Sequence, residues 1–377
     1  MDRVQQKQAL FAQNWRALAP LHKEGFRVEN RRLAAFFFAH FDRQADCEAI
    51  RAARWLVESH SNFANNGAFV AVLLAVHGGD VELLNRINVV RDLLVAAGFH
   101  GDSHYLGLAC YLIATGTEPE NYPHTAERTA AFYSGLAACE NFDALESFYP
   151  YAALLGLSAQ DVAGGVVYAQ ELRLWLWQSY ILHFHAAKAS EAEDTGPLNP
   201  FGLPALAIAA SDGHGAERAV ALLKALNNRK VWRPGFVVFS VILLPLMHTL
   251  GLLAQIPIDD ATLARELRQM QRLLKRQRGF SQLTVGKHQF YVTNSSLVAS
   301  AHCTELRQAG QAEAAARLSR LTLCTQFTGV FGSWDEEMAK PMGSGAVFGA
   351  PGVGAGGAAA NALAAKHEQK VQARSRK

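Results

Sequence analysis

Residues 63–78, FANNGAFVAVLLAVHG, contain the pattern that decides the fold. Two aromatic residues six positions apart enclose small and polar residues, and an unbroken apolar run then leads into a Gly-bearing turn. The same order recurs in residues 99–116, FHGDSHYLGLACYLIATG, and in residues 142–157, FDALESFYPYAALLGL. A run of about ten apolar residues makes a helix of nearly three turns that is buried on most sides.

A longer amphipathic segment joins each unit to the next. Between residues 81 and 97 apolar side chains recur at steps of three and four, Asp80 is placed as an N-cap, and Gly98 is placed as a left-handed terminator. The first aromatics of the three units lie 36 and 43 residues apart, a period typical of helical-pair arrays. Because one pair cannot bury its own apolar face, we predict an all-α fold of stacked helix pairs, an α-solenoid-like repeat.

Composition divides the chain into four regions. Residues 1–185 and 203–341 are predicted to be N-terminal and C-terminal helical-repeat regions. Residues 186–202, AAKASEAEDTGPLNPFG, are polar and bear Pro and Gly, which indicates a loop or boundary. Residues 342–377 are rich in Gly and Ala and end in a basic tail. This last region is expected to be disordered, since it cannot bury enough surface to offset its ordering entropy.

The charge and the cysteines exclude several protein classes. The formal net charge is +3, and its basic excess lies mostly in the C-terminal tail, which disfavours a charge-driven nucleic-acid binder. The five cysteines are odd in number and none is at C-x-x-C spacing, so neither a disulfide scaffold nor a zinc cluster is predicted. The N-terminal residues do not form a secretory signal. Reduced, buried thiols in a cytoplasmic protein are the plain interpretation.

An aromatic and histidine patch is the candidate binding site. Trp, Tyr and Arg dominate interaction hot spots, and a dense group of them occurs on one predicted helix. The simpler alternative is a helix that is buried on most faces. The candidate pocket or interface residues, with three more from the repeat turns, are Arg173, Trp175, Trp177, Tyr180, His183, His185, His104, Tyr105 and Tyr149.

Signatures of catalysis or metal binding are weak. His302 and Glu305 are one helical turn apart, but the further Glu/His motifs of a carboxylate-bridged metal bundle are missing, so no metal site is predicted. Asp259 and Asp260 are interpreted as the cap and first turn of a helix. The Gly-rich tail lacks both the strand and the Lys-Ser/Thr pair of a phosphate loop. The sequence therefore identifies neither a cofactor nor a catalytic group.

Residues 235–258 require a membrane test. They contain no Asp, Glu, Lys or Arg, and three basic residues precede them, as in a spanning helix. Pro245, His248, Gly251 and Pro257 interrupt the stretch, which favours two buried helical segments instead.

The repeat resembles a bacterial protein family of unknown function, the domain family numbered 4003. The resemblance covers about residues 33–323 and is carried by NNGAFVAVLLAV, LLVAAGFHGDSHYLGLACYLIA, ESFYPYAALLGL and GFSQLTVGKHQFYVTNSSLVAS. These are packing and turn motifs, and the 186–202 insertion and the tail depart from the pattern. The resemblance implies an all-helical bacterial protein and transfers no functional residue.

Three functional hypotheses follow from these patterns. The first is a helical-repeat protein that binds a protein or peptide partner along a concave surface. The second is an enzyme or small-molecule binder with an aromatic and histidine pocket between helix pairs, so the question of enzymatic activity stays open. The third is membrane attachment through residues 235–258.

Overall fold

The computed structural model describes residues 2–24, 26–63, 67–139, 146–184, 202–211, 215–228, 248–277, 280 and 287–331. The chain divides into two units, residues 1–192 with 196–332, and residues 193–195 with 333–377. All of the described residues belong to the first unit. Helices from both sides of the 186–202 insertion therefore share one unit. The insertion itself, apart from Gly202, and the 342–377 tail lie outside the described residues.

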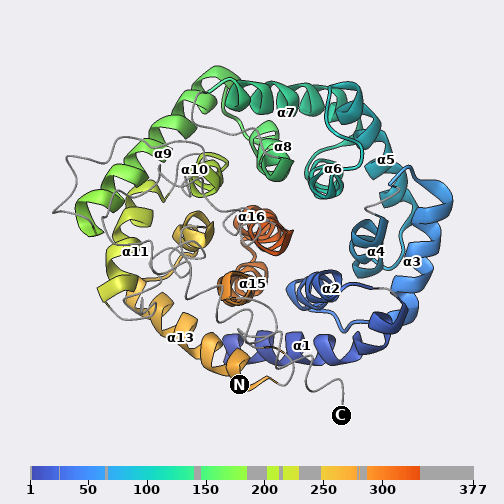
Figure 1. The fold of residues 1–377 in the computed structure, drawn as a ribbon, viewed down its shortest axis with the longest axis horizontal. Helices are drawn as coiled ribbons and strands as arrows, with labels where there is room; N and C mark the ends of the chain where they lie inside the picture. Colours follow the sequence, from blue (N-terminus) through green and yellow to red (C-terminus); the bar gives the residue numbers. More distant parts are fainter. Residues whose placement is uncertain are drawn as a thin grey trace, which may run out of the picture. The chain divides into compact units, whose positions relative to one another are not determined.

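Helices of the first unit form an outer and an inner layer (Figure 1). The outer helices are α1 (Arg3–Ala17), α3 (Cys47–His60), α5 (Val81–Ala96), α7 (Tyr122–Ala137), α9 (Val162–Phe184), α11 (Ala216–Asn228) and α13 (Asp260–Arg276). The inner helices are α2 (Val28–His40), α4 (Gly67–Val76), α6 (His104–Gly116), α8 (Tyr149–Leu157), α10 (Gly202–Ala209), α15 (Lys287–Gln308) and α16 (Ala312–Phe331). Residues 248–254 are also helical. Short 3-10 turns are formed by Ala19–Glu24, Pro119–Asn121 and Glu146–Phe148.

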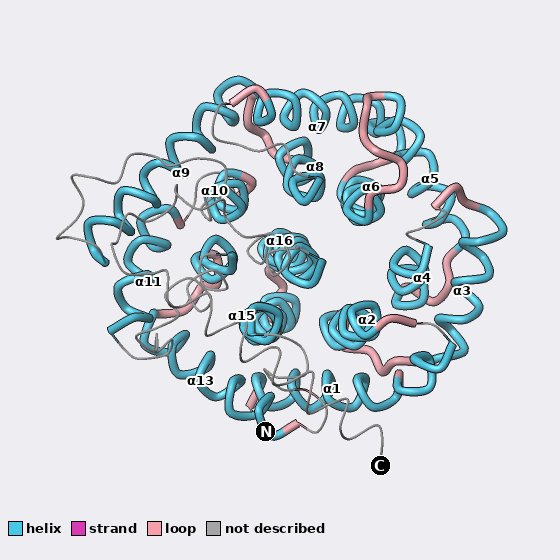
Figure 2. The backbone as a smooth tube through the Cα atoms, viewed as in Figure 1, coloured by secondary structure: helices cyan, strands magenta, loops and turns pink. Residues whose placement is uncertain are grey.

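The apolar runs of the repeat become the inner helices. In α4 every residue from Phe69 to Val76 is buried, because outer helices cover one side and inner helices the other. The predicted cap is confirmed, since the Asp80 carboxylate accepts a hydrogen bond from the backbone N–H of Glu82. Gly98 ends α5 with φ +98°, which lets Phe99 N–H donate to Leu94 C=O at 3.1 Å. The described residues contain no strand (Figure 2), so the predicted all-α paired-helix fold is confirmed.

The inner helices α2, α4 and α6 run parallel. The Phe37 and Phe69 rings are 5.5 Å apart, and further along the same two helices the Phe41 and His77 rings are 5.2 Å apart. Nε2 of His77, the residue after α4, in turn lies 2.8 Å from the Tyr111 hydroxyl of α6. Each outer helix therefore returns the chain to the same end, as a repeat of helix pairs requires.

The array of pairs closes into a ring. α1 packs against α13 and α15, and α2 packs against α15 and α16. α16 lies in the centre of the inner layer (Figures 1 and 2) and contacts α2, α6 and α8. Its Phe327 ring is 4.2 Å from the Phe69 ring and 5.6 Å from the Tyr105 ring. The inner surface of the array is therefore covered by the chain's own last described helix.

Basic residues of outer helices bind the carbonyls at the ends of the following inner helices. Arg128 of α7 donates to the carbonyls of Gly156, Ser158 and Gln160 at 3.1, 2.9 and 2.6 Å. Arg218 of α11 does the same for Ala254, Ile256 and Ile258. Lys7 of α1 reaches Ala39 C=O at 2.9 Å. Cations at a helix C-terminus satisfy carbonyls that have no intrahelical partner and complement the helix dipole.

The membrane hypothesis concerns a stretch that is only partly described, because residues 235–247 lie outside the described part. Within the part that is described, every helix is either too short or too polar to cross a membrane.

Candidate functional site

The predicted aromatic patch lies on α9, and its described side chains do not share one face of the helix. Arg173 is buried, whereas Trp175, two residues later, is 36% exposed on the outer wall. Trp177, Tyr180 and His183 belong to the same helix, but their side chains, like all of His185, lie outside the described part. The described portion of α9 thus places one aromatic ring at the surface.

The three residues from the repeat turns serve different contacts. Tyr149 is buried at the start of α8, with its ring 4.5 Å from that of Phe99 and 5.0 Å from that of Tyr133. Burial raises the pKa of its hydroxyl, which accepts a hydrogen bond from His100 N–H at 3.2 Å. Tyr105 packs on Phe327 of the central helix, and His104 is exposed at the start of α6. These contacts hold the layers together.

Charged and polar side chains are concentrated where the ring closes. We call this the closing interface: α1 and α2 on one side, and α13, α15 and α16 on the other. At its first cluster, His302 Nε2 of α15 lies 2.8 Å from a Glu266 oxygen of α13, and its Nδ1 lies 3.5 Å from Glu305. Arg3 of α1 pairs with both carboxylates. The pair His302 and Glu305, noted in the sequence, is thus part of an ion-pair network.

This network is not arranged to bind a metal ion. No group of three or more potential ligands converges among the described residues. Burial alone would raise the pKa of Glu266, but hydrogen bonds from His302 and Arg3 outweigh it and hold the pKa below its ordinary value of 4.5. The carboxylate is therefore ionised at neutral pH and is held by Arg3 and the His302 ring.

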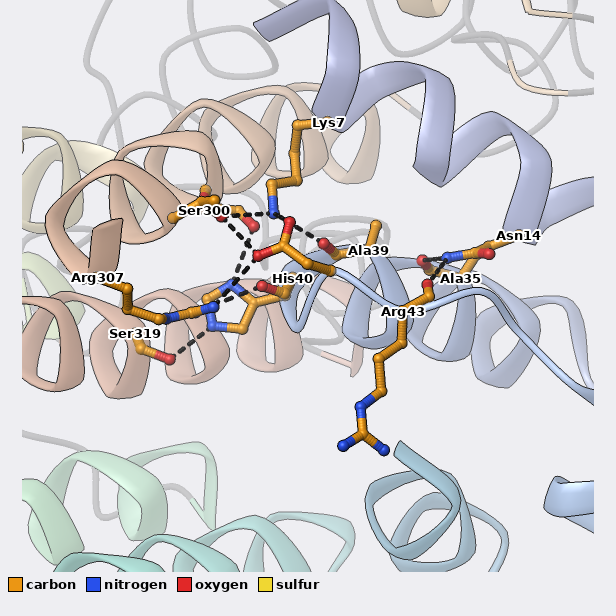
Figure 3. Close-up of polar contacts among 11 residues, drawn as sticks. Lys7, Asn14, Ala35, Ala39, His40, Arg43, Ser300, Arg307 and Ser319 are labelled. Carbon is orange, nitrogen blue, oxygen red and sulfur yellow. Dashed lines mark hydrogen bonds and ion pairs between the residues drawn. The ribbon is translucent and has the colours of Figure 1, made fainter. Parts of the chain in front are cut away.

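The second cluster surrounds Lys7 (Figure 3). The ammonium group is almost fully buried and donates to Ala39 C=O, to an Asp42 oxygen at 2.5 Å and to the Thr304 hydroxyl at 2.9 Å. Thr304 and Arg307 of α15 also donate to the other Asp42 oxygen, at 2.8 and 3.3 Å. Asp42 consequently joins α1, the end of α2 and α15.

The backbone of Asp42 is left-handed, with φ +58°. Residues other than glycine adopt this region at a cost, and the position after a helix normally favours glycine. Arg43 N–H donates to Phe38 C=O at 2.7 Å, which is the hydrogen bond of such a helix end. An aspartate at this position provides the carboxylate that Lys7, Thr304 and Arg307 share.

His40 is the buried centre of the closing interface. Its Nδ1 lies 3.1 Å from the Ser300 hydroxyl of α15, and its Nε2 lies 2.6 Å from the Ser319 hydroxyl of α16 (Figure 3). Burial, and then the charges of Lys7 and Arg307, depress its pKa well below 6.5. The imidazole is therefore neutral, with one ring nitrogen donating and the other accepting. In the part of the chain that the structure describes, both ring nitrogens lie at serine hydroxyls and neither lies at the carboxylate that orients the histidine of a hydrolase triad.

A buried arginine marks the other end of α2. Arg32 is 1% exposed and donates to the Gln289 side chain of α15, while its Nε has no hydrogen-bond partner. Gln289 donates in turn to Val330 C=O near the end of α16, at 3.2 Å. Burial lowers the pKa of Arg32 to about 10, with Glu29 acting in the opposite direction. The negative end of the α16 dipole is the favourable partner for this cation.

A buried histidine outside this interface makes stability depend on pH. His248 contacts Thr325 C=O at 3.0 Å, and burial lowers its pKa to about 4. Because the unfolded chain takes up a proton near 6.5, stability is lost as pH falls from 6.5 and levels off below 4. We expect this residue to lower the free energy of unfolding by about 2 kcal/mol between pH 7.5 and 5. In urea unfolding at both pH values, the free energy of unfolding of His248→Gln should change less with pH than that of the native chain. An equal change in both chains would contradict this assignment.

The outer wall carries an open polar cleft between the end of α3 and the middle of α5. Its volume is 420 Å³, and its lining residues are Ser59, His60, Ser61, Asn62, Asn88, Arg91 and Asp92. Asn88 fixes its geometry by donating to His60 C=O at 2.9 Å. We call this the outer cleft.

An exposed tryptophan stands beside the outer cleft. Trp55 of α3 is 66% exposed, and its ring centre is 6.1 Å from that of His60. On α5, Val89 is 53% exposed, next to Asn88. The buried residues of α3 are Ile50, Ala53 and Val57, so Trp55 is out of phase with the apolar stripe. This phase is readable in the sequence and is the signal that could have identified the surface.

Comparisons with known proteins supply no relative. No protein-family model, curated protein or solved structure matches the chain. The resemblance to the family of unknown function numbered 4003 therefore stays a prediction.

Proposed function

We propose that this protein is a helical-repeat scaffold that binds a protein partner through Trp55 and the outer cleft. The observation that carries the proposal is the exposure of Trp55 at 66% beside a 420 Å³ cleft. Tryptophan and arginine are the residue types that contribute most to protein interfaces, and a large ring in water gains free energy when a partner covers it.

The outer wall is favoured over the inner surface for a physical reason. Open helical arrays bind partners along their concave side. In this ring α16 covers that side and buries Phe327 against Phe69 and Tyr105. A partner at the inner surface would have to displace a helix whose side chains are largely buried, whereas the outer cleft is open.

The outer cleft offers hydrogen bonding without a strong net charge. Arg91 pairs with Asp92 at 3.0 Å, and Arg54 of α3 pairs with Glu58 at 2.7 Å. The lining of the cleft is polar and includes Ser59, Ser61 and Asn62. A polar cleft beside an exposed apolar ring suits a peptide segment that offers its backbone to the cleft and an apolar side chain to Trp55.

We expect Trp55→Ala to weaken partner binding about thirty-fold, since truncation of a central interface tryptophan costs about 2 kcal/mol or more. The measurement is quantitative mass spectrometry of proteins that copurify with the full chain at native expression in its own host. Trp175→Ala is the matched control, because it removes an exposed tryptophan from a different outer helix.

Two results would contradict the proposal: repeated absence of any stoichiometric partner, or equal recovery with Trp55→Ala. Native mass spectrometry of the purified protein distinguishes the alternative. A retained small mass would favour the small-molecule binder with a pocket between helix pairs, and a bare mass would not.

We assign the protein to the cytoplasm as part of the proposal, because all five cysteines are free and burial raises the pKa of the Cys110 and Cys324 thiols.

A further inference from the structure

The closing interface differs from the rest of the ring in what holds it together. Neighbouring pairs elsewhere are joined largely by apolar contacts, such as Phe37 with Phe69 and Gly107 with Val70. Across the closing interface α1 also makes an apolar contact, with Phe11 and Trp15 packed on Phe280. Between the α2 segment and the α15–α16 hairpin, however, the boundary is crossed by side-chain hydrogen bonds: Arg32 donates to Gln289, His40 bonds Ser300 and Ser319, and Asp42 accepts from Thr304.

The surroundings of His40 determine what a proton would do there. Lys7 comes from α1, and Cys303 and Arg307 from α15, while the groups that α16 presents are the Ser319 and Thr322 hydroxyls. Arg320 of α16 is directed to the end of α6, near Gly116. Asp42 is the carboxylate of this cluster, and Lys7, Thr304 and Arg307 already occupy it. An imidazolium at the fully buried His40 would therefore add a positive charge beside buried Lys7 and exposed Arg307, whose shared carboxylate, Asp42, is itself 43% exposed.

The first cluster has the opposite charge environment. His302 lies between the carboxylates of Glu266 and Glu305, which Arg3 also contacts. His40 is therefore the histidine of the closing interface whose charged neighbours oppose an added proton. The helix faces that meet at His40 belong to α2, α15 and α16.

We propose that the closing interface is an acid-sensitive gate: uptake of one proton by His40 separates α2 from the α15–α16 hairpin and opens the ring. The gate is independent of partner binding at Trp55, which lies on α3 outside the closing interface. Opening would uncover the polar groups of α15 and α16 that contact α2 in the closed ring, namely the Gln289 side chain and the Ser300 and Ser319 hydroxyls.

The size of the effect follows from proton linkage. A histidine that titrates near 6.5 when the ring is open, and far lower when it is closed, destabilises the closed state about tenfold at pH 5.5 and about thirty-fold at pH 5.0. Below pH 5 ordinary carboxylates begin to titrate, so the diagnostic window is pH 7.5 to 5.0.

Hydrogen–deuterium exchange of the full chain, corrected for the intrinsic pH dependence of exchange, measures this opening helix by helix. We expect protection of α2 and α15 to fall about tenfold relative to α6 and α8 between pH 7.5 and 5.5. His40→Gln, which keeps a hydrogen-bonding side chain but takes up no proton, should abolish the difference. The matched control is His77→Gln, because His77 is a half-buried histidine just after α4 that hydrogen-bonds Tyr111 of α6 rather than a group of α15 or α16.

Equal loss of protection in all inner helices would overturn the proposal, as would a His40→Gln chain that keeps the difference. Should His40→Gln fail to fold, the His248→Gln chain decides, because it removes the other buried histidine that contacts α16, at Thr325 and Thr328. A relative loss that deepens threefold from pH 5.5 to 5.0 supports uptake at a histidine, and a loss that begins only below pH 5 overturns it.

Discussion

Arg128→Met is expected to lower the free energy of unfolding by about 3 kcal/mol, a large fraction of the stability of an ordinary domain. The guanidinium donates to three carbonyls at alternate positions, those of Gly156, Ser158 and Gln160. Hydrogen bonds to a charged donor contribute about 1.5–3 kcal/mol each, but Arg128 is half-buried and water replaces part of that sum. Methionine keeps most of the side chain's volume and removes all three bonds.

Chemical denaturation with urea measures this change, with Arg128→Lys and Arg54→Met alongside. Lysine keeps the charge but not the planar fork, so its cost should be intermediate. Arg54 makes an exposed ion pair with Glu58, and its loss should cost less than about 1 kcal/mol. If Arg128→Met and Arg54→Met cost the same, the carbonyls at the end of α8 do not depend on this arginine.

The repeat could be predicted because its cause is local. Short apolar runs, Asp80 before a helix and Gly98 after it depend only on neighbouring residues, and each of these expectations is confirmed. Pairing of helices follows from the same pattern, since an apolar face must be covered by the next pair.

Closure of the ring could not be predicted in this way. It depends on contacts between residues far apart in sequence, such as Arg3 with Glu266 and His40 with Ser300. Nothing in the residues beside His40 indicates that α15 and α16 return to it. The filling of the inner surface by α16 depends on the same closure, so the concave surface expected from an open array is covered.

The candidate site residues illustrate a second limit. A cluster of aromatic residues in the sequence of one helix does not reveal which side chains share a face. Arg173 and Trp175, for example, are two residues apart, but the first is buried and the second is exposed. The phase of a residue against the apolar stripe is more informative. Trp55 follows Ala53 by two positions, which turns it about 200° away from the buried side.

Close approach of α7 and α8 leads to the second large expected effect. A Cβ atom at Gly156 would lie 2.3 Å from the Thr129 hydroxyl oxygen and 3.1 Å from both Thr125 O and Thr129 N. The first contact is with a side chain, but the other two are with the backbone of a neighbouring helix, which cannot move alone. Gly156→Ala should therefore force α8 away from α7 and cost about 3 kcal/mol or more.

Gly107→Ala on α6 is the matched control. There the added Cβ would meet the Val70 and Phe69 side chains at 3.1 and 3.6 Å, and side chains can shift by a few tenths of an ångström. Its cost should be at most about 1 kcal/mol, since alanine also favours the helix. Adding Thr129→Ala to Gly156→Ala removes the shortest contact and should recover part of the loss, because the backbone contacts remain. Urea unfolding of the native chain, Gly156→Ala, Gly107→Ala and the double variant measures these free energies. Equal losses for Gly107→Ala and Gly156→Ala would contradict the prediction, because they would mean that α7 and α8 can separate without added cost.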